Sequence, residues 1–479
     1  MKYDLLLKNT MILNPDGNVT EGQYLAIKDR RIARITSEVV PDSMAAQVLD
    51  CTGKLTMPGM VDGHTHTSQQ LLRGRLADEY AMIWTRFLVP FESTLHSDDV
   101  YYSALLYCIQ AIKAGITGFA ESGGRFMERT IQAAVETGMR AAVARSMMDS
   151  GREITPQMLE TKEEALDRND ALYEAYQGAG DGRIQVYYGM RQVMTCTPAF
   201  MEAIAEHANA RHTGIHAHLC EHRNEVSFCL RNYKLRPVEL MEKVGMLGPR
   251  LVTAHNVALS EHDITLLSKY RVKLIHCPFA NLINHGFPKT PTLLESGCYV
   301  GLGRDGAAYN SVDLFEEMRV LRACLISYYG LPAFDPVVMP VKTALRLSTE
   351  GGAAALGMED CLGRVEEGCI ADLITVNMMR PHILPTNNRT TAVLDTVTAQ
   401  DVEDSIIDGK LMPALNTIEG MGGNAAETLA EAAKHGKFLS RDDIRQRTAV
   451  NAKTVEHLAE MGLLGDLPES NQLSIFDFA

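Results

Sequence analysis

Histidines and carboxylates stand at the ends of several apolar segments of the chain. His64 and His66 end one such segment and are separated by a single residue. On a β-strand, residues i and i+2 point to the same side, so both imidazoles can reach one point. His218 and Asp305 end two later segments. Three histidines and one carboxylate suit Zn²⁺ or Fe²⁺ and leave a position for water, so we predict these four residues as the ligands of one divalent metal ion.

This ligand set predicts hydrolytic chemistry. A divalent metal lowers the pKa of a bound water molecule toward ~7. Glu221 lies three residues after His218 and can carry a proton from water to a leaving amine, as general base and then general acid. His255, at the end of another segment, can hold the water or polarise the substrate, and Asp305 can hydrogen-bond the water. We therefore predict Glu221, His255 and Asp305 as catalytic residues.

Two further histidines leave more than one interpretation open. His216 lies two residues before His218, and we predict it as a hydrogen-bonded core residue. His276 ends the seventh apolar segment. It is predicted either to contact the substrate or to support the site without touching it.

The elements that must position these residues alternate between apolar strands and helices from residue 55 onward, which is typical of parallel βα units. Eight strand candidates cover residues 55–66, 115–123, 140–149, 184–194, 214–221, 251–257, 272–278 and 299–306. Ser97, Thr197 and Ser260 are candidate helix N-caps. Eight units predict an α/β fold of the (β/α)8 TIM-barrel type, with the site at the C-terminal rim of the strands.

The chain divides into three predicted parts. Residues 1–54 and 364–412 contain short strands, and we predict that they pair in one small β-sandwich domain built from both flanks of the barrel. Residues 55–363 are the predicted barrel. Residues 413–479 are predicted as a small helical tail that packs on itself.

Composition sets limits on the function. The chain has 479 residues and a net charge of -14, and such an acidic surface makes nucleic acid an improbable partner for the barrel. The sequence contains no run of 18 apolar residues and no apolar segment at its N-terminus. We therefore expect no membrane span and no signal peptide, and a cytoplasmic location.

Several blocks of the sequence resemble the amidohydrolase superfamily. PGMVDGHTH, HLCE, AHN, HCPFAN and GLGRDGAAYN are similar to the motifs of its triazine hydrolases, S-adenosylhomocysteine and methylthioadenosine deaminases and guanine deaminases. The resemblance covers about residues 1–412 and implies a hydrolase that releases ammonia from a nitrogen heterocycle. It implies the same ligands and catalytic residues as above. No lysine at the end of the fourth strand is available to bridge a second metal, so we expect one ion, Zn²⁺ first and Fe²⁺ as the alternative.

Arg191 departs from the deaminase pattern. It lies in GMRQVMTC, where S-adenosylhomocysteine deaminases carry a histidine that contacts the substrate, and guanine deaminases resemble this chain there. Arginine is a fixed fork of donors that suits a carbonyl or carboxylate acceptor. We predict that Arg191 binds substrate, with a surface ion pair as the alternative. This residue favours oxopurines, pterins or triazines over adenosine.

Two other residues, Cys277 and Trp84, bear on the predicted site. Cys277 follows His276 where many relatives have asparagine. Trp84 is the only tryptophan and lies in the loop after the first barrel strand. It is predicted either to stack on the heterocycle or to pack the loop.

The tail resembles a different family, the C-terminus of the bacterial C-type DNA polymerase III. Residues 418–426 fit a helix–hairpin–helix turn, and Gln472 to Phe476 resemble a peptide that binds a sliding clamp. Ser440 is a predicted helix cap, and Leu439 and Ile444 are among the apolar positions predicted to pack together. The tail has ten acidic and six basic residues, which predicts little DNA affinity.

Three functions therefore remain open. The first is hydrolytic deamination of a heterocycle such as a purine, a nucleoside, guanine or a pterin. The second is a triazine-type hydrolase that removes chloride or an alkylamine. The third is an interaction protein that reaches a sliding clamp or DNA through its tail. A small heterocyclic substrate is the expected partner, and a homo-oligomer is possible.

Overall fold

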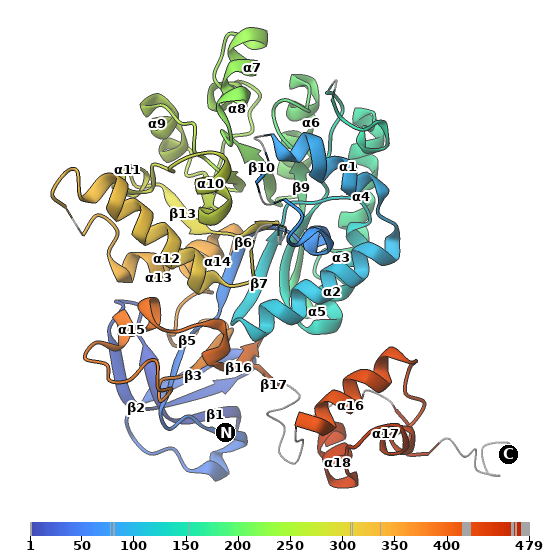
Figure 1. The fold of residues 1–479 in the computed structure, drawn as a ribbon, viewed down its shortest axis with the longest axis vertical. Helices are drawn as coiled ribbons and strands as arrows, with labels where there is room; N and C mark the ends of the chain where they lie inside the picture. The colour runs from blue at the N-terminus through green and yellow to red at the C-terminus, as the bar shows by residue number, and fades with distance from the viewer. Residues whose placement is uncertain are drawn as a thin grey trace, which may run out of the picture. The chain divides into compact units, whose positions relative to one another are not determined.

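The computed structural model describes residues 2–76, 78–79, 82–151, 153–306, 308, 310–335, 337–413, 423–460, 464 and 467–470. The chain forms two compact units, Met1–Leu411 and Met412–Ala479. The first unit contains a nine-stranded parallel sheet, which is the barrel, and an eight-stranded mixed sheet (Figure 1).

The barrel strands follow one another around the sheet in chain order, and each pair is parallel. They are β6 (Met60–His66), β7 (Ile116–Glu121), β8 (Arg140–Ala144), β9 (Ile184–Met190), β10 (Ile215–Leu219), β11 (Leu251–His255), β12 (Lys273–His276), β13 (Tyr299–Leu302) and β14 (Asp305–Gly306). The eighth predicted strand is divided into β13, which pairs with β12, and β14, which pairs with β6. The ring closes across this division, which confirms the predicted fold class.

Helices cover the outside of the barrel (Figure 1). The helices of this unit are α1 (Val89–Thr94), α2 (Ser97–Lys113), α3 (Met127–Thr137), α4 (Lys162–Tyr176), α5 (Ala179–Gly182), α6 (Pro198–Ala210), α7 (Arg223–Tyr233), α8 (Pro237–Lys243), α9 (Glu261–Lys269), α10 (Pro278–Asn284), α11 (Thr290–Glu295), α12 (Leu314–Leu325), α13 (Val341–Ser348), α14 (Glu350–Ala355) and α15 (Arg389–Asp395). Thr197 and Ser260 cap α6 and α9 as predicted. The predicted cap at Ser97 is wrong by one residue, because His96 occupies that position and its backbone N–H donates to Asp99.

The first predicted strand, 55–66, is two strands in different sheets. β5 (Lys54–Pro58) pairs with strands of the eight-stranded sheet, and only β6 enters the barrel. The chain changes sheet at Gly59, where a Cβ atom would lie 2.1 Å from the Thr117 Oγ1 atom. Only glycine permits so close an approach. Both strands are almost entirely buried, so the apolar pattern alone gave no sign of the division.

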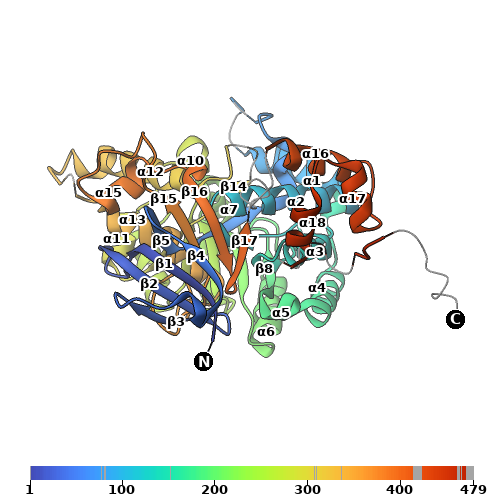
Figure 2. The same cartoon turned by 90° about the horizontal axis from the view of Figure 1, so that it is seen from below.

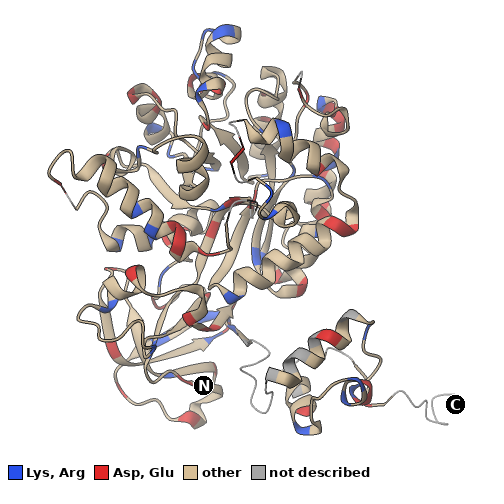
Figure 3. Cartoon of the chain, in the orientation of Figure 1, with Lys and Arg blue, Asp and Glu red and all other residues tan. Residues whose placement is uncertain are grey.

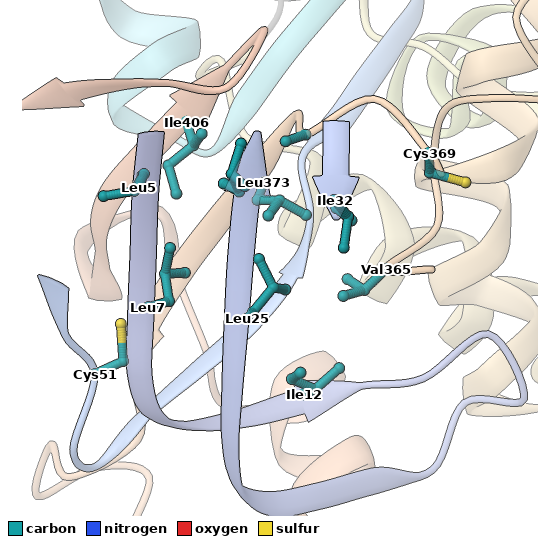
Figure 4. Close-up of a cluster of buried hydrophobic side chains, with 12 residues drawn as sticks. Leu5, Leu7, Ile12, Leu25, Ile32, Cys51, Val365, Cys369, Leu373 and Ile406 are labelled. Carbon is teal, nitrogen blue, oxygen red and sulfur yellow. The ribbon is translucent and has the colours of Figure 1, made fainter. Parts of the chain in front are cut away.

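The eight-stranded sheet joins both flanks of the barrel, and Figure 2 shows its strands gathered beside the barrel. Besides β5 it contains β1 (Tyr3–Leu13), β2 (Val19–Lys28), β3 (Arg31–Thr36), β4 (Ala45–Asp50), β15 (Leu373–Asn377), β16 (Val402–Ile407) and β17 (Lys410–Pro413). The first half of β1 pairs with β4 and its second half with β5. The strands therefore curl around one apolar core, which includes Leu5, Leu25 and Leu373 (Figure 4).

Buried ion pairs fix this sheet to the N-terminal ends of the barrel strands. Arg140, the first residue of β8, donates to Asp372 at 2.8 Å and to Asp408 at 3.4 Å. Arg183, just before β9, lies 3.7 Å from the Asp408 carboxylate. Because the sheet is attached at this end, the opposite, C-terminal rim of the barrel remains available for a site.

The second unit has its own small core. Its described helices are α16 (Gly423–Lys434), α17 (Arg441–Arg447) and α18 (Ala452–Glu460), and Ile444, Val455 and Leu458 are buried between them. Ser440 caps α17 as predicted. Leu439 is 66% exposed, so the prediction that it joins this core is wrong. Residues 418–422 of the hairpin and the clamp-like Gln472 to Phe476 lie outside the described residues.

We expect a chain that ends after Pro413 to fold without the tail, because each unit buries its own apolar core. Its melting temperature should lie within a few degrees of that of the full chain in a calorimetric scan. As a control, Ile444→Ala in the full chain should destabilise only the tail. Insoluble protein after truncation would show that the first unit needs the tail.

Two surface properties bear on possible partners. No helix in the described part of the chain is both long enough and apolar enough to cross a membrane. Basic and acidic positions are interspersed over the outer helices of the barrel (Figure 3). This pattern differs from the basic stripe that follows a nucleic-acid backbone.

Candidate active site

The predicted chemical residues converge at the C-terminal ends of the barrel strands. His64 and His66 lie at the end of β6, His218 near the end of β10, His255 at the end of β11 and Asp305 at the start of β14. All five are at least nine-tenths buried. Because the strands follow one another around the barrel in chain order, these side chains form a ring around one centre.

Their ligand atoms lie within reach of a common ion. His66 Nε2 is 3.2 Å from His218 Nε2, and Asp305 Oδ1 is 3.5 Å from His66 Nε2 and 3.7 Å from His64 Nε2. The ligand atoms of His64, His66 and His218 all lie within 4.8 Å of one another, as do those of His64, His255 and Asp305. Bonds of about 2.0–2.2 Å to one metal ion fit such spacings.

Hydrogen bonds on the far side of the rings orient two of these histidines. His218 Nδ1 lies 2.7 Å from the backbone oxygen of Arg191, which can only accept, so the proton is on Nδ1 and the Nε2 lone pair is free. His64 Nδ1 lies 2.9 Å from His216 Nε2, and His64 Nε2 is buried without a hydrogen-bond partner. His216 therefore acts as a support for His64, in agreement with its predicted place in the core.

Burial keeps the imidazoles of His66 and His218 neutral. Burial lowers the pKa of His66 well below its usual range, and the positive charge of Arg191 lowers it further. Burial lowers the pKa of His218 in the same way. Burial alone would raise the pKa of Asp305, but its histidine neighbours outweigh this and hold the pKa far below the ordinary value. Neutral imidazoles around an ionised carboxylate, with a buried lone pair lacking a partner, fit a divalent cation.

Unusual backbone conformations aim several of these side chains. His255, Asn256 and Asp305 have φ angles of 74°, 54° and 65°, in the left-handed region that side chains other than glycine rarely adopt. The Asn256 side chain bonds the backbone oxygen of Thr253 at 2.9 Å and fixes the turn after β11. Strained residues of this kind gather at functional sites.

Glu221 is held as a carboxylate beside the ligand cluster. Gln192 Nε2 donates to one of its oxygens at 2.7 Å, and His285 Nε2 lies 3.2 Å from the other. Burial opposes ionisation, but His255 and His285 outweigh it and lower the pKa of Glu221 to about 2. The backbone N–H of Glu221 donates to Glu225 at 2.9 Å. Glu221 is thus positioned as a proton acceptor.

Arg191 is buried in a pair with Glu92. Its Nη1 atom donates to the Glu92 carboxylate at 3.0 Å, and Gln69 Nε2 donates to the other oxygen of Glu92 at 2.7 Å. The two partners are only 3% and 1% exposed. The ion pair that we considered as the alternative therefore exists, but it is buried and not at the surface. Arg191 also lines the pocket over the cluster, so its fork is held rigidly at the pocket wall.

Comparison with known proteins decides the family. The model of the amidohydrolase family matches residues 55–412. The chain belongs to the amidohydrolase family. It is 34% identical over 419 residues to a 5'-deoxyadenosine deaminase of Methanobrevibacter smithii, covering 85% of this chain and 92% of that protein. It is 33% identical over 444 residues to a 5-methylthioadenosine/S-adenosylhomocysteine deaminase of Pelotomaculum thermopropionicum, covering 91% and 99%.

A solved structure is also similar. The crystal structure of an adenosine deaminase from Xanthomonas campestris with bound zinc has a TM-score of 0.80 and 25% identity, covering 93% of this chain and 99% of that one. A model of the helix-hairpin-helix motif matches residues 376–473. This match includes most of the tail, which is thus similar to that motif, whereas its resemblance to a DNA polymerase stays a prediction.

The pocket of this amidohydrolase is nearly filled. Its free volume is about 20 Å³, which holds roughly one water molecule. Met82, Ile83 and Trp84 cover it from the loop after β6. Trp84 is 8% exposed, packs in an apolar cluster with Leu88 and lines the pocket, so both predicted roles remain compatible with its position. A heterocycle is larger than this volume, so lining side chains must shift to admit it.

His276 lies behind the pocket of the amidohydrolase. It is fully buried, its Nδ1 atom is 2.9 Å from Thr290 Oγ1, and it is not among the described residues that line the pocket. Burial, followed by the proximity of His255, lowers its pKa to about 3. This position favours the supporting role that we considered over contact with substrate.

Sequence reasoning missed Glu92, Gln192, His285 and Asn281. Asn281 lies 2.9 Å from His255 Nδ1, which leaves Nε2 of His255 toward the pocket. Gln192 follows Arg191 directly in the sequence, and this position was the signal that could have identified Gln192 as a site residue. Asn281 ends the HCPFAN block, which was the available signal for it. Glu92 and His285 lie far along the chain from their partners, outside the quoted motifs.

Proposed function

We propose that this amidohydrolase is a hydrolytic deaminase that releases ammonia from an amino-substituted nitrogen heterocycle. The observation that carries the proposal is the position of Glu221. It is an ionised carboxylate that lines the same small pocket as His66, His218 and Asp305. Such an arrangement suits removal of a proton from water and its delivery to a departing amine.

The ligands in this proposal are His64, His66, His218 and Asp305, with Zn²⁺ as the resident ion and Fe²⁺ as the alternative. When bound, the metal supplies Lewis acidity that lowers the pKa of water toward ~7. Glu221 takes the water proton on a carboxylate oxygen and passes it to the leaving nitrogen. His255 carries its proton on Nδ1, toward Asn281, so its Nε2 accepts a hydrogen bond from the attacking water. The water has two hydrogens, so His255 and Asp305 share the one that Glu221 does not take.

The proposed substrate carries a ring carbonyl. The relatives are named as deaminases of adenosine-type nucleosides, which supports a purine-like ring. Adenine offers no carbonyl oxygen, whereas the pocket presents the rigid donor fork of Arg191. We therefore place oxopurines and pterins ahead of adenosines. A cytoplasmic location belongs to the same proposal, and the ten free cysteines support a reducing compartment.

An ammonia-release screen tests the proposed reaction. Metal-loaded protein would be offered guanine, other aminated oxopurines, pterins, adenosines, cytosine and aminotriazines. Chloride and alkylamine release from substituted triazines would be followed in parallel. Ammonia release from at least one amino heterocycle is expected. Release of chloride or alkylamine alone would make the chain a triazine-type hydrolase instead.

Arg191→Met should reduce kcat/KM for an oxopurine or pterin by about 10- to 100-fold more than for an adenosine. A hydrogen bond to a charged group contributes about 1.5–3 kcal/mol, and only the oxo ring offers an acceptor for it. Steady-state kinetics on both substrates would measure the ratio.

The single variant leaves Glu92 buried without its partner, so Arg191→Met combined with Glu92→Gln is the matched control for folding. The double variant should show the same change in preference with its melting temperature restored. Equal losses on both substrate classes would remove Arg191 from substrate recognition.

A further inference from the structure

A second cavity lies outside the barrel and shares no lining residue with the pocket over the ligand cluster. Its volume is about 440 Å³, within the range of roughly 300–1,000 Å³ that small-molecule sites occupy. The loops after β7 and β8, the segment 157–160, and helices α3 and α4 supply its walls. Nothing in the proposed deamination uses this space.

The cavity is basic, in contrast to the acidic chain around it. Arg125, Arg145 and Arg168 line it against two carboxylates, Glu128 and Glu160. Glu160 is already neutralised, because Arg145 binds both of its oxygens at 2.9 and 3.1 Å and Arg168 binds one at 2.7 Å. Within a chain of net charge -14, this is a local surplus of positive charge.

Several donors in the cavity remain available. Arg168 uses only Nη1 for Glu160, and its side chain is 63% exposed. Arg125 uses Nη1 for the backbone oxygen of Ser93 at 2.8 Å. Ser146 is only 8% exposed, and its hydroxyl is buried at the cavity without a hydrogen-bond partner. A buried polar group of this kind is normally satisfied by water or a ligand.

The remaining walls are apolar or aromatic. Phe126, Met158, Leu172 and Tyr176 line the cavity beside the arginines. A ligand that fits these walls combines an anionic group with a flat or apolar body. Arginine forks match the geometry of phosphate and carboxylate oxygens.

We propose that this cavity binds a small organic anion. Arg125 and Arg168 hold its phosphate or carboxylate group, Ser146 donates a hydrogen bond to it, and Phe126 and Tyr176 contact its ring. The site adjoins the active site through packing. Met158 belongs to the same apolar cluster as Trp84 and Leu88, which line the first pocket.

Calorimetric titration of the full, metal-loaded chain tests this proposal. Phenyl phosphate and benzoate are the probes, because they separate the two anionic groups, and phenol is the uncharged reference. One of the two anions should bind at millimolar concentration or below, and phenol should bind far more weakly. Arg168→Ala should weaken the binding of the anion by about 10-fold or more, since it removes a charge-assisted hydrogen bond. Arg231→Ala, an exposed arginine on α7, controls for the change in net charge.

Arg168 is mostly exposed, so its replacement should preserve the fold, and unchanged turnover would verify this. Binding that persists in Arg168→Ala but disappears in His66→Ala would place the anion at the metal ligands and overturn the proposal. So would the absence of binding by both anions.

Discussion

Replacing Glu221 with glutamine should lower kcat by about 10²- to 10⁴-fold, the usual contribution of general acid–base catalysis. Glutamine keeps the shape of the side chain and can still hydrogen-bond to Gln192 and His285, but it cannot take a proton from water. The metal content should stay the same, because Glu221 is not one of the four proposed ligands. Turnover with the best substrate of the screen and elemental analysis measure the two quantities.

Glu206→Gln is the matched control for this variant, since Glu206 is exposed on α6 and does not line the pocket. It should leave both quantities unchanged. Near-normal kcat in Glu221→Gln would remove Glu221 from proton transfer, and another group lining the pocket would have to take that role.

His66→Ala should abolish both metal binding and measurable turnover. His66 Nε2 lies 3.2 Å from His218 Nε2 and 3.5 Å from Asp305 Oδ1, so the substitution removes a ligand atom that adjoins two others. Metal content per chain after dialysis would be measured by elemental analysis, and folding by the melting temperature without metal.

The control is His262→Ala, because His262 is 61% exposed on α9. It should keep the metal and the activity. If His66→Ala retained a full complement of metal, the ligand assignment would be wrong even if turnover had fallen.

The sequence alone was enough to predict the site residues that lie at the ends of strands. His64, His66, His218, His255 and Asp305 each end an apolar segment, and parallel strands in a closed barrel bring such ends to one rim. The distances of 3.2–3.7 Å between their atoms are a consequence of that topology. The eighth strand was placed correctly even though it is divided, because both pieces keep the direction of the barrel.

The sequence could not predict contacts between segments that lie far apart in the chain. The partner of Arg191 is Glu92, which is 99 residues away in the chain, and neither has a spacing that indicates the other. The exchange of sheets at Gly59 depends on how closely Thr117 approaches, which is a tertiary property. The cap of α2 was misplaced because the His96 backbone, not the Ser97 side chain, meets Asp99. Leu439 is apolar but exposed, and only the packing of the tail shows this.

Titration of the metal-free full chain with Zn²⁺, while ammonia release is followed, tests the central claim most directly. The claim is that one metal ion at His64, His66, His218 and Asp305 serves a deamination. Ammonia release should be negligible without metal, rise in proportion to added Zn²⁺ and level off at one ion per chain. Ammonia release that does not depend on metal, or that continues to rise to two ions per chain, would contradict it.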